Sequence, residues 1–285
     1  MRKNESFCGW YFRCRAGEKT LALIPAAHTA EGRTTGSLQI ITRDRCWNVP
    51  FSGEETAVAE AEPRAVLDRN IFCGRGLRLE LERVGLSARG VLRFGPPAPP
   101  RYDVMGPFCG VPGMECRHRV FSFRHRVDGL LTLNGEEYRF EQGTGYIEGD
   151  RGCSFPRQYL WTQADFPGGA LMLSAAEIPL GPVRFTGVIG AVLLGGRELR
   201  LASYLGGRAA RIGGGRILVR QGPLTLEAAC LEPPRNTLCA PAAGAMRRAI
   251  RENVSCRARY RLARSGKTLL GFETDGAAFE YEYPW

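Results

Sequence analysis

Hydrophobic and polar residues alternate with a period of two along most of the chain. The clearest example is residues 76–84, where leucines alternate with arginine and glutamate. This period places successive side chains on opposite faces, which is typical of a half-buried antiparallel strand. Residues 86–94 repeat the pattern after Gly85, so the two segments are predicted to form a hairpin.

Further hairpins are predicted by turn residues between short apolar segments. Asn134-Gly135 is the strongest of these signals. One segment, Pro241–Asn253, has good helix formers and no turn signal before its end, which favours a short helix. Roughly sixteen to twenty short strands with little helix predict an all-β protein made of antiparallel barrels or sandwiches. A closed barrel has no exposed edges and can enclose a small apolar ligand.

Length and cysteine content limit the class of protein. The 285 residues suffice for one large domain or two smaller ones. No apolar segment approaches the roughly 20 residues that span a bilayer, and the N-terminus lacks the apolar core of a signal peptide. We therefore expect a cytoplasmic protein. The ten cysteines include no Cys-x-x-Cys pair, which favours reduced thiols over disulfides or a structural metal.

The net charge of +10 comes almost entirely from arginine. Such a charge is compatible with nucleic acid, an anionic membrane or an acidic ligand as partner. The arginines are scattered along the chain, however, and no helix-turn-helix, zinc-finger or RNP pattern is present. We interpret them as solvated strand faces and expect no nucleic-acid partner. Peripheral contact with an anionic membrane is the alternative.

Residues 143–165 concentrate the side chains that could carry chemistry. Alternation places Tyr146, Glu148 and Asp150 on one face of a strand, which we expect to point into the barrel. Inside a barrel, desolvation would raise the pKa of such a carboxyl, whereas a partner such as Arg151 would lower it. A raised pKa suits a general acid. The alternative is that the two carboxylates lie at a rim and pair with surface arginines.

A second set follows directly on the next predicted strand. Tyr159, Trp161, Gln163 and Asp165 share one face by the same period. An apolar lining with a few polar groups is typical of a small-molecule pocket. The aromatic side chains would equally serve as core filler with a hydrogen-bonded polar end.

Two histidines, His118 and His125, are each flanked by arginines. Because they are seven residues apart, an unbroken strand directs them to opposite faces, and only a bulge would bring both to one site. Neighbouring arginines favour a neutral imidazole that acts as base or acceptor. A purely structural role is the alternative.

The segment from Tyr146 to Pro156, Tyr-Ile-Glu-Gly-Asp-Arg-Gly-Cys-Ser-Phe-Pro, followed by Trp161 and Gln163, resembles the signature of tocopherol cyclase-like proteins. Residues 7–13 resemble the opening strand of that family, and residues 114–125 resemble the segment that precedes its signature. The plant-like signature has tryptophan at the position of Arg151.

The resemblance implies a fold and an activity. The fold is two consecutive lipocalin-like barrels, related to carotenoid hydratase-like and Diels–Alderase-like proteins. We place the barrel with the signature at residues 1–180 and the second at residues 181–285. The implied reaction is a cofactor-free, isomerase-type cyclisation, in which a prenyl double bond is protonated and a quinol hydroxyl closes a chromanol ring.

Two functional hypotheses follow. In the first, an apolar prenylated or polyketide-like small molecule is cyclised, with Asp150 or Glu148 as proton donor. In the second, the protein is a non-catalytic, lipocalin-like carrier of a hydrophobic ligand. Neither requires a cofactor or metal, and the oligomeric state is open. The residues expected to contact the ligand are Tyr146, Arg151, Tyr159, Trp161, Gln163, His118 and Trp10.

Overall fold

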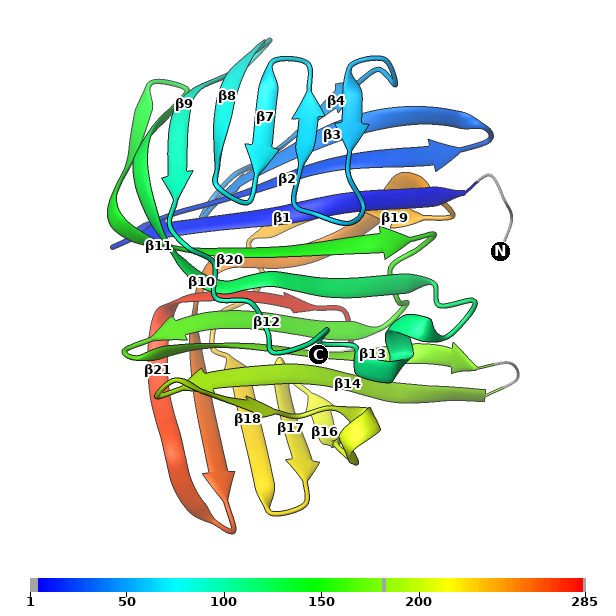
Figure 1. Ribbon diagram of the computed structural model, residues 1–285, viewed down its shortest axis with the longest axis vertical. Helices are drawn as coiled ribbons and strands as arrows, with labels where there is room; N and C mark the ends of the chain where they lie inside the picture. Colours follow the sequence, from blue (N-terminus) through cyan, green and yellow to red (C-terminus); the bar gives the residue numbers. More distant parts are fainter. Residues whose placement is uncertain (1–4, 181–182, 284–285) are drawn as a thin grey trace. The chain divides into compact units, whose positions relative to one another are not determined.

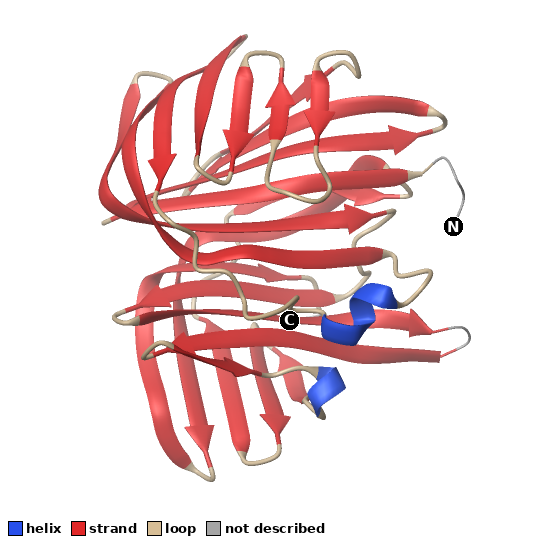
Figure 2. Ribbon diagram, in the orientation of Figure 1, coloured by secondary structure: helices blue, strands red, loops and turns tan. Residues whose placement is uncertain are grey.

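The computed structural model describes residues 5–180 and 183–283, and almost all of this part of the chain is β-strand (Figures 1 and 2). Two short 3₁₀ helices, η1 (Gly106–Gly110) and η2 (Ser203–Leu205), are the helical segments described (blue in Figure 2). No described helix has the length and apolar character needed to cross a membrane. The strands form two large antiparallel sheets, which confirms the all-β prediction and the two-barrel lipocalin-like fold.

The chain divides into two compact units. The first contains residues 1–100, 112–155 and 238–249, and the second contains residues 101–111, 156–237 and 250–285. The division therefore follows Phe155, not residue 180 as the sequence suggested. A boundary at 180/181 would split a hairpin whose strands pair from Gly169 to Leu194. Gly181, the first residue of the expected second barrel, lies outside the described residues.

The sheet of the first unit has eleven strands in the order β4-β3-β2-β1-β11-β10-β9-β8-β7-β6-β5. It curls until strands near its two ends pack together: a Cβ added to Gly36 of β3 would lie 2.1 Å from Thr56 Oγ1 of β5. This contact needs a glycine. The strands are β1 (Ser6–Ala16), β2 (Lys19–Ala30), β3 (Arg33–Thr42), β4 (Cys46–Phe51), β5 (Thr56–Val58), β6 (Ala65–Leu67), β7 (Asn70–Cys73), β8 (Gly76–Arg83), β9 (Leu86–Phe94), β10 (Cys116–Leu133) and β11 (Glu136–Gly152).

One set of alternating side chains from these strands fills the first barrel. Phe12, Leu38 and Phe72 are completely buried in this core, and Trp10 and Ile147 belong to it. Burying a side chain of this size contributes roughly 1.5–3 kcal/mol each. The predicted hairpins over residues 76–94 and at Asn134-Gly135 are present as β8–β9 and β10–β11.

The helix predicted over Pro241–Asn253 is wrong. The chain forms β19 (Asn236–Ala242), a turn, and β20 (Ala245–Arg264). Ala243 and Gly244 have φ of 51° and 77°, so both adopt the left-handed conformation of a tight hairpin turn. Sheet pairing along β20 overrides the local preference for helix.

Residues 238–249, which include the turn of this hairpin, belong to the first unit. The side-chain amide of Gln39 donates to the carbonyl oxygen of Cys239 at 3.0 Å and accepts from its N–H at 2.9 Å. The amide thereby replaces the two hydrogen bonds that a neighbouring strand would make. At the turn, the N–H of Gly244 donates to the carbonyl oxygen of Cys153 at 2.8 Å.

The sheet of the second unit has the order β15-β14-β13-β12-β21-β20-β18-β17-β16, and β19 pairs with β20. Its core includes Leu160, Val192, Leu226 and Tyr260. The remaining strands are β12 (Tyr159–Phe166), β13 (Gly169–Leu180), β14 (Val183–Leu194), β15 (Arg197–Arg200), β16 (Arg208–Gly213), β17 (Arg216–Gln221), β18 (Leu224–Cys230) and β21 (Lys267–Tyr281).

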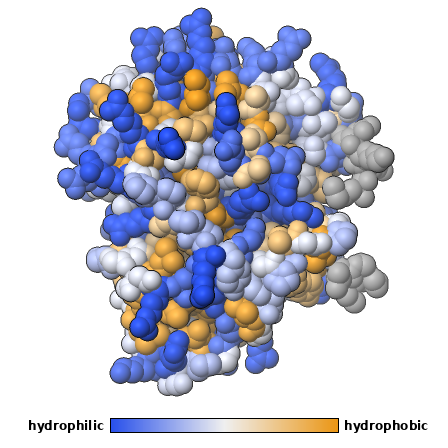
Figure 3. All heavy atoms as spheres, in the orientation of Figure 1, coloured by the Kyte–Doolittle hydropathy of each residue, from blue (hydrophilic) through white to orange (hydrophobic). Residues whose placement is uncertain are grey.

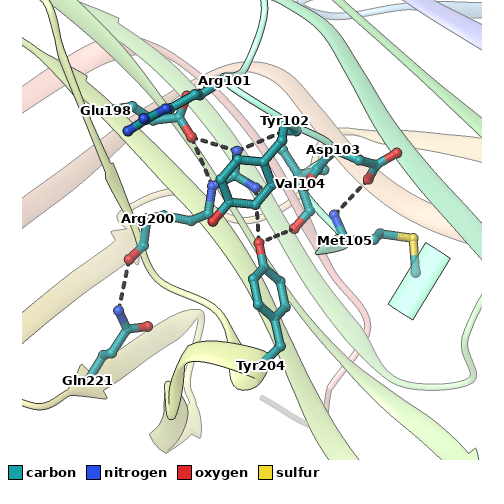
Figure 4. A network of polar contacts seen from close by, with 9 residues as sticks. All are labelled: Arg101, Tyr102, Asp103, Val104, Met105, Glu198, Arg200, Tyr204 and Gln221. Atoms are coloured by element: carbon teal, nitrogen blue, oxygen red, sulfur yellow. Dashed lines mark hydrogen bonds and ion pairs between the residues drawn. The ribbon is translucent and has the colours of Figure 1, made fainter. Parts of the chain in front are cut away.

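Residues 101–111 belong to the second unit because Arg200 holds them there (Figure 4). Its guanidinium lies 3.5 Å from the ring centroid of Tyr102 and donates to the backbone carbonyl oxygens of Tyr102 and Asp103, both at 2.7 Å. Glu198 neutralises it at 2.6 Å, and the Tyr204 hydroxyl accepts a further bond at 2.9 Å. Arg200 is thus a buried anchor for a segment whose only regular element among the described residues is η1.

Candidate functional site

A histidine between two carboxylates marks the candidate site in the first unit. His118 of β10 is directly opposite Asp150 of β11 in the strand register. Its Nδ1 lies 3.0 Å from Asp150 Oδ1, and its Nε2 lies 3.2 Å from Glu148 Oε2. The Tyr146 hydroxyl donates to the same oxygen of Glu148. The predicted grouping of Tyr146, Glu148 and Asp150 on one face is therefore confirmed.

The direction of that face differs from the prediction. Ile147 and Gly149, which alternate with the acids, are opposite Phe12 and Trp10 of the core. The acids therefore lie on the outer face of β11 and do not point into the barrel. Period two groups side chains, but only the pairing with β1 decides which group faces the core.

Burial sets the protonation of this cluster. Burial is the main cause that raises the pKa of Glu148, which is 5% exposed, although the charge of His118 opposes the shift. Burial alone would lower the pKa of His118, but the charges of Glu148 and Asp150 outweigh it and hold that pKa well above its usual value. The pKa of Tyr146 is raised well above its usual value, chiefly by burial. The cluster therefore retains a proton at neutral pH.

Three neighbours of the cluster were not identified from the sequence. In the β1–β11 register, Tyr11 is opposite Glu148 and Arg13 is opposite Tyr146, and both side chains are buried. The thiol of Cys116 lies 3.5 Å from Asp150 Oδ1. Residues 7–13 attract attention in the sequence only through resemblance, because the register with β11 is not a local property.

Trp10 and Arg151 occupy a different place from the acids. The Trp10 indole N–H donates to the carbonyl oxygen of Ala59 at 2.8 Å, and Arg151 pairs with Glu60 at 2.6 Å. Arg119 binds the carbonyl oxygen of Ala61 at 2.6 Å. The three side chains thus fix residues 59–61, and the structure does not bring Trp10 or Arg151 to His118.

His118 and His125 lie on opposite faces although β10 is irregular between them. His118 is opposite Asp150 and His125 is opposite Gly145, so β10 advances seven residues while β11 advances five. The two extra residues are absorbed in bulges, and the net shift of two preserves parity. His125 packs against Phe94 in the barrel interior, with ring centroids 4.8 Å apart.

The second predicted set lies in the second unit. Leu160 and Ala164 of β12 belong to the core of the second unit. The residues that alternate with them, which include the predicted set, therefore lie on the outer face of the sheet. Tyr159 there donates to Glu280 Oε2 at 2.5 Å, and the Gln163 amide donates to Asp165 Oδ1 at 3.0 Å. The remaining member of the set, Trp161, is buried, as are Tyr159 and Gln163, whereas Asp165 is half-buried.

His118, Glu148 and Asp150 each offer a ligand atom within 4.8 Å of the others, a spacing compatible with ligation of a divalent cation. In the observed geometry each imidazole nitrogen faces a carboxylate. A metal ion would have to replace one of these contacts.

Comparison with known proteins identifies the fold. No protein-family model and no curated protein matches the sequence. Among solved structures, a Nitrosomonas europaea protein assigned as an AttH has TM-score 0.53 and 14% identity, over 99% of this chain and 94% of that chain. CghA with bound Sch210972 has TM-score 0.63 and 12% identity, over 98% and 88%. These similarities show the shared two-barrel fold, consistent with the resemblance to tocopherol cyclase-like proteins.

Proposed function

We propose that the His118 cluster donates a proton to an apolar, unsaturated small molecule, and that the protein is a cofactor-independent cyclase of the tocopherol cyclase type. One observation carries the proposal: an imidazole lies between two carboxylates, 3.0 Å from Asp150 and 3.2 Å from Glu148. A buried carboxyl with a raised pKa and an adjoining imidazole are the groups that a general acid requires near neutral pH.

Exposure assigns different roles to the two acids. The Asp150 side chain is 22% exposed and that of Glu148 is 7% exposed, so Asp150 is the member that a ligand would reach. Oδ1 of Asp150 faces His118 and Cys116, which leaves Oδ2 to meet the substrate. Glu148 and Tyr146 form the buried end of this series of hydrogen-bonded side chains. They supply His118 with its proton.

The proposed reaction is balanced without a cofactor. Asp150 passes the proton held by the cluster to a prenyl double bond, and a quinol oxygen attacks the resulting cationic carbon to form the ring C–O bond. The proton released from that oxygen returns to the Asp150 carboxylate. The net change is an isomerisation, and His118 beside Asp150 stabilises the carboxylate formed in the first step.

The arginine in the signature does not oppose this chemistry. Arg151 is on the opposite face of β11 from Asp150 and is paired with Glu60. Its charge is therefore neutralised by Glu60 and directed away from the proposed proton donor. It does not repel a cation that forms on the face of β11 where Asp150 lies.

The substrate class is inferred from the fold and the resemblance. We propose a prenylated or polyketide-like molecule, since CghA, which shares the fold, was solved with the small molecule Sch210972. Tyr159, Trp161 and Gln163 are proposed as ligand contacts of the second unit.

Purified protein incubated with a prenylated quinol tests the reaction, with the chromanol product measured by liquid chromatography and mass spectrometry. Asp150→Asn should lower the rate by about 10²–10⁴, the usual contribution of a general acid. Glu137→Gln, which removes an exposed carboxylate from the same strand, should leave it unchanged. Absence of product from the natural protein, or full activity of Asp150→Asn, would contradict the proposal.

A non-catalytic carrier is the second candidate. The contacts of His118 with the carboxylates of Glu148 and Asp150 favour it, because an ion-pair network with a purely structural role also shifts pKa values. A carrier should co-purify with an apolar ligand detectable by mass spectrometry. Binding should then be lost in Trp161→Ala and retained in Asp150→Asn.

A further inference from the structure

Arginines that are scattered in the sequence lie together on the outer face of the second barrel. Strands β16, β17 and β18 contain four arginines and a single carboxylate, Glu227. Ile217 and Val219 point into the core, so the exposed arginines that alternate with them point outward. The four, which we term the arginine face, are Arg208, Arg211, Arg216 and Arg220.

The strand register places like charges side by side. Arg208 is directly opposite Arg220, and Arg211 is opposite Leu218, which is flanked along β17 by Arg216 and Arg220. Like charges directly opposite each other in a sheet are destabilising. Within residues 5–180 and 183–283, none of the four arginines has an ion-pair or hydrogen-bond partner on its side chain.

The face continues on β20, where the charge is partly compensated. Arg257 and Arg259 both pair with Glu273 of β21, at 2.5 Å and 3.0 Å. Arg261 is opposite Glu227 in the register. Uncompensated charge is therefore concentrated toward β16 and β17, at the end of the sheet.

We propose that the arginine face docks on an anionic phospholipid surface. Guanidinium groups bind phosphate with two parallel hydrogen bonds, and an array of them needs no complementary pocket. The half-buried Leu218 between the arginines adds apolar surface suited to a lipid interface. This inference does not depend on the proposed reaction.

The composition of the face favours lipid over nucleic acid. Strands β16, β17 and β18 contain no aromatic residue on which bases would stack, and single-strand binding relies on such stacking. Duplex DNA is read by a helix or a two-stranded ribbon that enters a groove, whereas this face is the outer surface of a broad antiparallel sheet.

Vesicle flotation of the full chain tests the proposal. The probes are phosphatidylcholine vesicles and vesicles in which about a third of the lipid is phosphatidylserine. The variant replaces Arg208, Arg211, Arg216 and Arg220 by Gln. The control replaces Arg33, Arg78, Arg89 and Arg93 of the first unit, all exposed, so that both variants have net charge +6, from +10 minus 4.

At about fivefold in binding for each arginine near the surface, the variant should lose at least about a hundredfold in binding to phosphatidylserine vesicles. The control should lose less than tenfold, and high salt should abolish binding by the natural protein. Circular dichroism and thermal unfolding establish that both variants fold. Equal losses in the two variants, no preference for phosphatidylserine, or tighter binding to RNA or duplex DNA than to vesicles would overturn the proposal.

Discussion

Gly145 lies directly against the imidazole of His125: a Cβ added to the glycine would be 2.2 Å from His125 Nε2. The two residues are opposite each other in the β10–β11 register and face the barrel interior. The glycine is needed because a larger side chain at this position would overlap the ring.

Gly145→Ala should therefore destabilise the protein by about 1–3 kcal/mol, the usual cost of inserting a methyl group into a packed core. Urea unfolding followed by circular dichroism measures the change. Gly213→Ala in β16 is the matched control, because no atom lies within 4 Å of its added Cβ. Equal stability of the two variants would show that the ring moves away without cost.

The three histidines of the chain should titrate in opposite directions. Burial lowers the pKa of His28 and of His125 to about 4, whereas the pKa of His118 is well above its usual value. At pH 5.5, NMR of the imidazole protons should thus find His118 charged and the other two neutral. A neutral His118 at that pH would contradict the proton-holding role of the cluster.

The two buried neutral histidines also predict acid sensitivity. Their folded-state pKa lies below the unfolded value near 6.5, so the stability they contribute is present above pH 6.5 and is lost as pH falls toward 4. The shift corresponds to at most about 3 kcal/mol for each histidine. Chemical unfolding at intervals between pH 7 and pH 4 measures the loss, which His125→Gln should reduce. A stability that is independent of pH in this range would contradict the prediction.

How far the sequence predicted the site depends on how local each feature is. The grouping of Tyr146, Glu148 and Asp150 follows from the period of a single strand and was predicted correctly. The direction of that group depends on pairing with Trp10 and Phe12, more than 130 residues away in the sequence, and it was predicted wrongly. No local pattern carries that register.

The same reasoning explains two other differences. Residues 241–253 have helical propensity, but β20 pairs with β18 and β21, and the paired sheet determines the conformation. Arg208 and Arg220 appear unrelated in the sequence, and only the β16–β17 hairpin places them opposite each other. The alternation of the β8–β9 and β10–β11 hairpins was predictable because each is closed by a short turn.

The charge of His118 should depend on Glu148. The carboxylates raise the His118 pKa against its burial, and Glu148 is the larger of the two contributions. Glu148→Gln should therefore lower that pKa toward or below its usual value, because the desolvation remains while the charge is lost. NMR titration of His118 measures the shift. Glu137→Gln removes an exposed charge from the same strand and should leave the titration unchanged; a His118 pKa unaffected by Glu148→Gln would exclude the coupling.

Arg200 should determine whether residues 101–111 remain attached to the second unit. Arg200→Ala removes the contacts to Tyr102, Asp103 and Tyr204 and leaves the carboxylate of Glu198, whose side chain is 12% exposed, without its cation. Removal of one partner of a buried ion pair costs about 3–5 kcal/mol. The segment has no regular structure apart from η1 and depends on these contacts, so its release should precede global unfolding.

Limited proteolysis under native conditions measures this release, with cleavage expected after Arg101 in Arg200→Ala and not in the natural protein. Arg197→Ala, an exposed arginine in the same strand, is the matched control and should resist cleavage. If Arg200→Ala unfolds cooperatively without earlier cleavage in the segment, Arg200 stabilises the whole second sheet. In that case the network in Figure 4 is part of the core of the unit and is not a local anchor.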